Sequence, residues 1–364
     1  MSSIDCVKRQ KRAMIVRYSE SCDGTGALQV LTTLLPLAVL WAAAILGARI
    51  SFWLAALATL PIAAVTLRTF ALMHDCGHDS LFRSRWLNRG VGFCLGVVAG
   101  MPQYVWSQHH NFHHAHNGNW DRYRGPYTTL SIDEYAALTD AQQRMYRRKC
   151  SVGTAPLAGF IYLVFNPRFT WAKGSVGLLA HIARGKFARP GTSIRQHAAG
   201  FETRYWKSRT EYWHMFGNNI VLLALWAAMS WAFGAALFFP IYLASLSIAG
   251  GAGILLFTVQ HNFRHSYASG NEGWDYDAGA IDGTSFLVLP AWLNWVTADI
   301  GYHHVHHLSA NIPNYRLVAC HNEFRHLFPT VTRIRLSGVY GALQCILWDR
   351  RARRIISVAE YLRQ

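Results

Sequence analysis

Four long stretches without charged residues constrain this chain more than any other feature. The first, Leu28–Ala48, is 21 residues long, enough at about 1.5 Å per residue to cross a hydrocarbon core of about 30 Å. The second is uncharged from Ser51 to Leu67, and its apolar pattern continues to Met73. A further pair occupies residues 212–234 and 235–259. Because the breaks within each pair are short, the sequence predicts two antiparallel hairpins, and thus an all-α polytopic membrane protein with transmembrane helices at 28–48, 51–73, 212–234 and 235–259.

The cations indicate how these helices are oriented. The chain has 35 Lys and Arg against 19 Asp and Glu, a net charge of +16. In the four-helix arrangement, 34 of the 35 cations lie on one side of the bilayer or at its boundary, and only Arg49 lies in an outer turn. The positive-inside rule then predicts that both termini and the Arg144–Arg209 segment are cytoplasmic. We expect a multi-pass protein of a bacterial inner membrane. Nucleic-acid binding is disfavoured, because the cations alternate with long uncharged blocks.

The remaining sequence predicts a cytoplasmic helical cap on the membrane helices. We expect one main domain at 28–330, between a basic N-terminal segment at 1–27 and a basic C-terminal segment at 331–364. Two shorter apolar stretches, Val91–Trp106 and Ala155–Phe165, are interrupted by Gly or Pro. They are too short to cross comfortably, so we interpret them as helices that lie in the membrane interface.

Histidines supply the strongest chemical signal. Of 18 histidines, 13 fall into four short clusters. A spacing of i, i+3 and i+4 places side chains on one face of a helix. The histidines in the first three clusters that follow this spacing are His74 and His78, then His110, His113 and His114, and then His303, His306 and His307. His109, His116 and His304 fall outside that register. Single histidines are usually surface or core residues, but three such clusters together predict metal binding.

The fourth cluster contains His261 and His265, either of which can complete the set. We favour His261, since it lies nearer the membrane helices and the other clusters, whereas His265 follows Arg264 and resembles a surface residue. The resulting nine imidazoles are too many for one tetrahedral zinc ion and suit two metals of higher coordination number. Redox chemistry on an apolar substrate favours iron. Zinc hydrolysis is the alternative, but the chain has no HExxH motif and no Glu beside these histidines.

Three carboxylates lie close to these histidines in the sequence. A metal-bound imidazole needs an acceptor that orients its second nitrogen. Asp75 and Asp79 each adjoin a histidine of the first cluster, and Asp299 precedes His303 by four residues. We expect these side chains to support the ligands, although each can equally cap or solvate a helix end.

The segments HDCGHDS, HNFHH and HHVHHLSANIPNY resemble the three histidine boxes of the integral-membrane fatty acid desaturases. The resemblance covers about residues 28–330, including the position of the second helix pair between the second and third boxes. The IP-x-Y after the third box and the Gln260-His261 pair are similar to the acyl-lipid branch of that family. Phe257 stands where the acyl-CoA branch carries an Asn.

The resemblance implies a non-haem di-iron centre with two Fe, which uses O2 to remove two hydrogens from the acyl chain of a fatty acid or lipid in the bilayer. It also implies electrons from a separate ferredoxin-like or cytochrome b5-like donor, since the chain shows no CxxCH or ferredoxin-like cysteine spacing. The alternative is a related hydroxylase, epoxygenase or carotenoid oxygenase with the same boxes. A histidine-rich metal transporter is disfavoured, because its ionisable groups would lie at mid-membrane.

Overall fold

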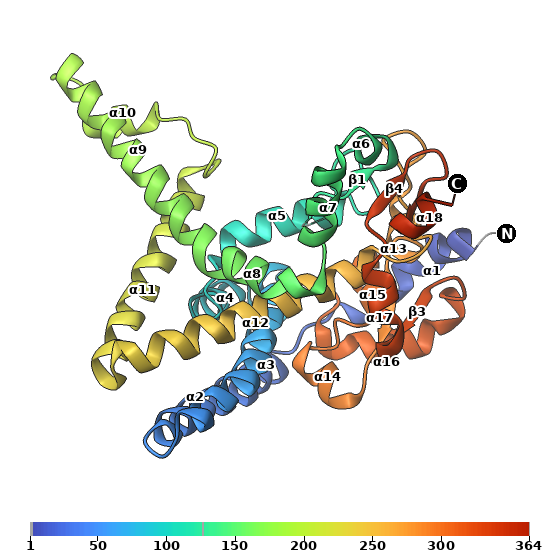
Figure 1. The fold of residues 1–364 in the computed structure, drawn as a ribbon, viewed down its shortest axis with the longest axis horizontal. Helices are drawn as coiled ribbons and strands as arrows, with labels where there is room; N and C mark the ends of the chain where they lie inside the picture. Colours follow the sequence, from blue (N-terminus) through green and yellow to red (C-terminus); the bar gives the residue numbers. More distant parts are fainter. Residues whose placement is uncertain (1–2, 126, 364) are drawn as a thin grey trace.

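Helices account for most of the structure. The computed structural model describes residues 3–125 and 127–363. Within these residues, the helices long and apolar enough to cross a membrane are α2 (Asp23–Ala48), α3 (Phe52–Gly77), α11 (Arg209–Phe233) and α12 (Ala235–His261). They form two hairpins whose turns lie at the same end of the molecule, at the lower left of Figure 1. The predicted helical membrane fold with four crossing segments is confirmed.

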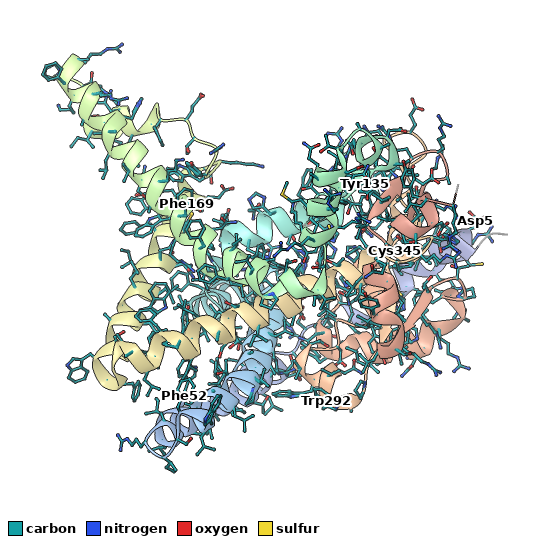
Figure 2. The ribbon with its side chains drawn as sticks, in the orientation of Figure 1. Asp5, Phe52, Tyr135, Phe169, Trp292 and Cys345 are labelled. Carbon is teal, nitrogen blue, oxygen red and sulfur yellow. The ribbon has the colours of Figure 1, made fainter. Side chains whose placement is uncertain are left out.

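The crossing helices expose apolar surface of the kind that lipid covers. Only 17% of the apolar window of α2, and the same share of α11, is buried inside the protein. Figure 2 shows Phe52, at the turn between α2 and α3, and Trp292, on α14 (Ala291–Val296), projecting from the surface. Their exposed fractions are 70% and 66%. Exposed apolar surface of this extent is typical of a membrane-embedded protein.

Two of the crossing helices continue beyond the spans that the sequence predicted. Helix α3 runs past Met73 to Gly77 and therefore includes His74. Helix α12 runs past Val259 to His261. The histidines of two clusters are thus carried on extensions of membrane helices. Helix α2 begins at Asp23 rather than Leu28. Its polar first turn is stabilised because the Asp23 carboxylate accepts a hydrogen bond at 2.7 Å from the backbone N–H of Arg83.

The expectation of one interfacial helix over Val91–Trp106 is wrong in its boundaries. The structure has two helices there, α4 (Arg85–Val98) and α5 (Gln103–Ala115). The chain turns between them at Gly100, whose φ of +75° is accessible to glycine at little cost. Pro102 lacks an N–H and disfavours a helical residue before it, so the first helix cannot continue. The turn gives α5, the helix that carries the second histidine cluster, a different direction from α4.

The second expected interfacial helix, Ala155–Phe165, is part of a longer run. It comprises α8 (Ala155–Gly159), a π-helical turn η2 (Phe160–Phe165) and α9 (Asn166–Ala188). Its beginning packs directly on α12, since a Cβ at Gly159 would clash with the backbone of Gly250 and Gly251. Helix α7 (Asp140–Lys149) and this run together are also long and apolar enough to form one membrane crossing that is interrupted by a bend of 65°.

The elements at the end opposite the hairpin turns form what we call the cap. Besides α7 and α14 its helices are α1 (Ser3–Tyr18), α6 (Ile132–Ala136), η1 (Val152–Thr154), α13 (Tyr276–Ile281), α15 (His303–Leu308), α16 (Asn314–Phe324), η3 (Arg325–Leu327), α17 (Leu336–Leu343) and α18 (Val358–Tyr361). One further short helix, α10 (Ile194–Ala199), lies against α9 away from the cap.

The cap also contains short strands, which the all-α prediction did not include. Strand β4 (Leu347–Asp349) pairs in parallel with β1 (Leu130–Ser131) and antiparallel with β5 (Arg354–Ile356). Strand β2 (Ser285–Val288) pairs in parallel with β3 (Thr332–Arg335), in the register Ser285 to Thr332. Strands of two to four residues are too short to show alternation in a sequence, and their partners are distant along the chain.

Both ends of the chain pack into the cap. On α1, the buried side chains of Val7 and Met14 join the same apolar cluster as Val305 and Leu308 of α15. The C-terminal segment contributes β3, β4 and β5 to the two small sheets. The termini lie near one another at the right of Figure 1. The basic segments predicted at 1–27 and 331–364 are therefore packed against the elements that carry histidines.

Candidate metal centre

Four helix segments bring the predicted histidines together. The end of α3 carries His74, with His78 directly after the helix, and α5 carries the second cluster. His261 is the last residue of α12. Helix α15 consists almost entirely of the third cluster. In each case the helical spacing turns the selected histidines to one side, as the sequence predicts.

The nine selected histidines form two groups in which the ligand nitrogens lie within 4.8 Å of one another. The first group contains His74, His78, His110, His114 and His306, and the second contains His113, His261, His303 and His307. Within the described part of the chain, neither group includes Cys, Asp or Glu. The structure thus provides two adjacent all-nitrogen sites, one with five imidazoles and one with four.

The nitrogens converge on common points rather than forming ordinary hydrogen-bonded pairs. His114 Nε2 lies 3.0 Å from His110 Nε2 and 3.1 Å from His306 Nε2. In the other group, His303 Nε2 lies 2.9 Å from His261 Nε2. A neutral imidazole has one N–H, so three Nε2 atoms cannot all be satisfied by one another. His78 Nε2 is buried without any hydrogen-bond partner. Such an arrangement fits a shared metal ion.

The environment favours the neutral form of the selected imidazoles on α5 and α15. Burial holds the pKa of His114 and of His306 well below the ordinary value, and the neighbouring imidazoles lower each pKa further. The pKa of His307 is lowered for the same two reasons. A neutral imidazole keeps the lone pair that a metal ion requires.

Asp75 is placed as the sequence predicts for a carboxylate that orients a ligand. Its Oδ1 lies 2.9 Å from His74 Nδ1, which leaves His74 Nε2 free to face the group. Its other oxygen accepts a hydrogen bond at 2.9 Å from the backbone N–H of Asn314, at the start of α16. A carboxylate at a helix N-terminus satisfies an otherwise unpaired donor. Asp75 therefore connects the first histidine cluster to the segment that follows the third.

Asp79 and Asp299 do not occupy the positions expected for that role. Asp79 is exposed and lies 3.8 Å from Arg85, and the His78 ring instead hydrogen-bonds to the Asn111 side chain. Asp299 interacts electrostatically with Arg68, and burial raises its pKa. In the described part of the chain, no hydrogen bond joins either carboxylate to a histidine of the two groups. Both residues have a positive φ of 56°, so each lies at a chain reversal that directs its side chain away.

The histidines left out of the register lie elsewhere. His265, the alternative to His261, is 3.3 Å from Glu360 at the surface. His304 is buried but faces away from the two groups, with its Nε2 2.8 Å from His321 Nδ1. His116 Nδ1 lies 2.9 Å from the backbone oxygen of Phe112. No local sequence pattern indicates His321 as the partner of His304.

A second residue that sequence reasoning missed supports the third cluster. The Tyr276 hydroxyl donates a hydrogen bond at 2.8 Å to the backbone oxygen of His307. The ammonium group of Lys11 lies over the Tyr276 ring and pairs with Asp277 at 2.7 Å. These contacts connect α1 to α15 through α13. Because the residues lie far apart in the sequence, no local pattern predicts that they meet.

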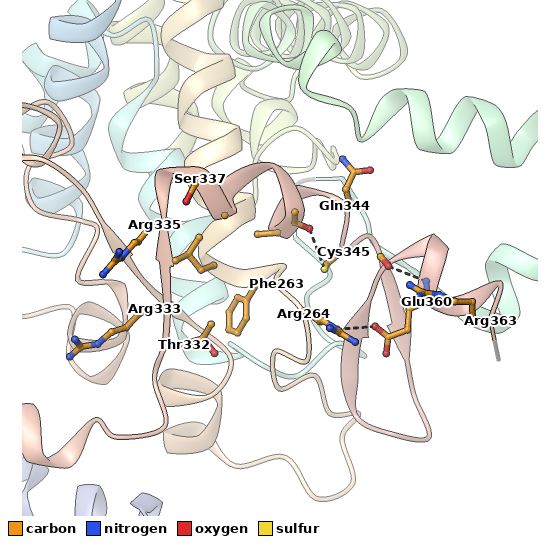
Figure 3. Close-up of a pocket in the computed structure, with 15 residues that line it drawn as sticks. Phe263, Arg264, Thr332, Arg333, Arg335, Ser337, Gln344, Cys345, Glu360 and Arg363 are labelled. Atoms are coloured by element: carbon orange, nitrogen blue, oxygen red, sulfur yellow. Dashed lines mark hydrogen bonds and ion pairs between the residues drawn. The ribbon is translucent and has the colours of Figure 1, made fainter.

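Two hollows adjoin the end of α12. One, of about 10 Å³, is lined partly by His113, His261, Tyr123 and Phe257, and has room for about one water molecule. The other is an open hollow of about 670 Å³ between β3, α17 and α18, shown in Figure 3. Phe263 lines this hollow, and an ion pair at 3.4 Å between Arg264 and Glu360 lies at its edge. It contains no histidine of the two groups.

Helical hairpins that cross a membrane, with buried histidine groups beside their ends, define a class of integral-membrane metalloprotein. Within that class the family is shown by comparison: residues 50–336 match the model of the fatty acid desaturase family, and the chain belongs to this family. It is therefore an oxidoreductase and an integral membrane protein, as predicted.

Individual relatives agree. A fatty acid desaturase of Bacillus subtilis (strain 168) is 30% identical over 356 residues, which cover 96% of this chain and 90% of that protein. A probable fatty acid desaturase of Sorghum bicolor is 28% identical, over 68% of this chain and 58% of that protein. An sn-1 oleoyl-lipid 12-desaturase of Anabaena variabilis is 23% identical, over 74% of this chain and 70% of that protein.

Proposed function

We propose that this protein is an O2-dependent di-iron desaturase that introduces a double bond into the acyl chain of a fatty acid or membrane lipid. The observation that carries the proposal is the convergence of nine imidazoles, from four separate segments, into one group of five and one of four. The three relatives described above are named as desaturases or a probable desaturase, and one of them is named for an oleoyl-lipid substrate. Desaturation of a lipid-linked chain is consistent with a site beside the ends of membrane helices.

Iron is the metal that best fits the donor set. Zinc favours four tetrahedral ligands, whereas five and four neutral imidazoles leave room for additional ligands at each metal. Two bound iron ions would supply an oxidant strong enough to cleave an unactivated C–H bond. His74, His78, His110, His114 and His306 would hold one ion, and His113, His261, His303 and His307 the other.

The overall reaction balances without a group from the protein being consumed. Two hydrogens leave adjacent carbons of the acyl chain, two electrons arrive from a separate electron carrier and two protons from solvent water, and O2 is reduced to two molecules of water. The chain contributes positioning: Asp75 orients His74, and the cap excludes water from the buried imidazoles. The acyl chain has to approach beside Tyr123 and Phe257, where only a small cavity is present and side chains have to move.

The electrons come from a separate carrier, in our proposal a ferredoxin-like or a cytochrome b5-like protein. We place its docking site on the cap, because such carriers are usually acidic and this chain carries a net charge of +16. The proposal also places both termini, the cap and the active site in the cytoplasm of a bacterial cell, where reduced carriers are available. The distribution of Lys and Arg supports this orientation.

Lipid and metal analysis together test the proposal. The chain is expressed in a bacterial host, and acyl chains are compared between the wild type and a His306→Ala variant. We expect a new double bond with the wild type only, and two iron ions per chain in the purified protein. One zinc ion per active chain and no iron would contradict the metal assignment. A hydroxylated or epoxidised product would instead identify a related oxygenase.

A further inference from the structure

Residues 166–208 form an arm that extends away from the rest of the molecule, at the upper left of Figure 1. The arm consists of α9, the short helix α10 and the segment that returns to α11. Helix α9 has 23 residues, about 35 Å at 1.5 Å per residue. The arm leaves the body through η2, which contacts α12, and returns directly into α11. It is therefore attached at both ends to elements beside the crossing helices.

One face of α9 is covered by the returning segment. Gly174 packs against Trp206, Gly177 against Phe201 and Gly185 against His197, at distances where a Cβ would press on or clash with each ring. These glycines repeat at spacings that place them on the same side of the helix. The arm is thus a hairpin whose internal contacts use only this side.

The face turned away from the glycines carries an exposed apolar stripe. Its members follow one another three or four residues apart along the helix: Phe165, Phe169, Ala172, Val176, Ala180, Ala183 and Phe187, with Leu179 at the edge. Val176 and Leu179 are each 66% exposed, and Phe187 is 92% exposed. Figure 2 shows Phe169 on the outside of α9. The Lys173 ammonium group lies over the Phe169 ring, 5.4 Å from its centroid, whereas Val176, Leu179 and Phe187 remain open.

Cations flank the stripe. By helical periodicity Lys173 and Arg184 lie along one edge and Lys186 along the other. Residues 166–209 contain nine Lys and Arg and one acidic residue, Glu202. A helix with an apolar face bordered by cations matches the surface of an anionic bilayer, where the apolar face enters the acyl boundary and the cations meet lipid phosphates.

We propose that the α9–α10 arm lies flat on the cytoplasmic leaflet and binds anionic phospholipids. Charge and continuity with the crossing helices both favour lipid as the partner. A crossing orientation is disfavoured, since Lys173, Arg184 and Lys186 would enter the bilayer together with the polar return segment. The proposal goes beyond the desaturase activity, and it rests on the proposed function only for the choice of the cytoplasmic leaflet.

The root of the arm is connected to the candidate metal centre. Tyr162, in η2, accepts a hydrogen bond at 2.8 Å from the indole N–H of Trp106. The Trp106 ring stacks on His110, with centroids 4.5 Å apart and planes at 16°. The arm therefore leaves the body beside an element that is hydrogen-bonded to Trp106, the ring neighbour of the candidate ligand His110.

Spin-label depth measurement tests the proposal on the full-length protein. Exposed Cys22 and Cys94 are first replaced by Ser, and single nitroxide labels are placed at 176, 183 and 187, with a matched label at exposed Gln142 on α7. The protein is reconstituted into nanodiscs of phosphatidylcholine alone or mixed with phosphatidylglycerol. We expect the three arm labels to collide with O2 but not with a soluble nickel chelate, at one common shallow depth, and the label at 142 to collide with the chelate.

A charge variant separates anionic recognition from simple apolar contact. In the triple variant Arg184→Gln, Lys186→Gln and Arg189→Gln, we expect the chelate accessibility of the label at 176 to rise several-fold in the phosphatidylglycerol nanodiscs. Val16→Ser, which removes an apolar side chain that is 74% exposed on α1, serves as the control. It should leave the chelate accessibility of the label at 176 unchanged. Water-exposed arm labels in both compositions would overturn the proposal, as would depths that increase steadily across the bilayer. Spin–spin broadening between copies would identify a second chain as the partner instead.

Discussion

The imidazoles of His114 and His307 stack face to face, with ring centroids 4.2 Å apart and planes at 16°, although they belong to different groups of converging nitrogens. The five-histidine and four-histidine groups therefore contact each other directly through two candidate ligands. Metal ions held by the two groups would be neighbours, as the proposed di-iron chemistry requires. A change in either residue is expected to disturb both groups.

The first prediction compares His303 with His304. His303→Ala removes a nitrogen from the four-histidine group, so we expect loss of metal and activity in a folded protein. His304→Ala removes none. It removes the partner of His321 and creates a cavity at a fully buried position. Together these losses lower the free energy of unfolding by about 1–3 kcal/mol. Metal per folded chain and thermal unfolding distinguish the two, and His116→Ala should be milder still. A His304→Ala protein that folds but lacks metal, beside a metal-loaded His303→Ala, would show that the assigned register is wrong.

The second prediction concerns Asp75. Asp75→Asn keeps the size of the side chain but weakens its contact with His74 and with the Asn314 N–H. We expect metal affinity or activity to fall about 10- to 100-fold, the usual cost of losing a residue that orients a ligand. The rate of metal loss to a chelator measures this directly. Asp79→Asn is the matched control, because Asp79 is paired with Arg85, and an equal loss there would refute the distinction between the two.

The third prediction concerns the contact between α8 and α12. Gly159→Ala places a methyl group against the backbone of Gly250 and Gly251, which cannot rotate away. Small residues at such crossings let membrane helices approach closely. We expect the free energy of unfolding to fall by about 1–3 kcal/mol, seen as a lower unfolding temperature in detergent. Gly153→Ala has open space around the new methyl group and should be neutral. Equal stability of the two variants would contradict the close packing.

The fourth prediction concerns topology. Single cysteines at 49 and 235 should react with an impermeant thiol reagent from outside the cell, and those at 147 and 350 only from inside. Native Cys150 is buried, so exposed Arg147 is the better probe of that segment. A label at 189 decides whether α8 and α9 cross, as their bent pairing with α7 allows. We expect 189 to react only from inside. Outward labelling at 147 or 350 would separate the histidines across the bilayer and refute a shared site.

The parts of the structure that the sequence predicted are those with a local signal. Uncharged runs identified the four crossing helices, because length and apolarity are sufficient for that assignment. The i, i+3, i+4 register selected eight of the nine histidines that converge and set aside His304, because helical geometry decides which side each residue faces. The position of His261 beside a membrane helix indicated the ninth.

The parts that the sequence did not predict depend on distant partners. Asp79 adjoins a selected histidine just as Asp75 does, yet a left-handed backbone turn sends it toward Arg85. The partners of His304 and of the His307 backbone, His321 and Tyr276, lie on other elements. The short strands likewise form only because the C-terminal segment folds back against residues 130–131 and 285–288.

The wide separation of the histidines along the chain sets the order in which the molecule can be completed during synthesis. His113 and His307 are neighbours in space but 194 residues apart in sequence. While the first hairpin is already in the membrane, its histidines have no partners, and the set is incomplete until α15 has left the ribosome. Helix α15 also packs in one apolar cluster with α1, which is synthesised long before it. Segments made early and late thus meet at one place, and metal loading would follow the synthesis of α15 rather than guide it.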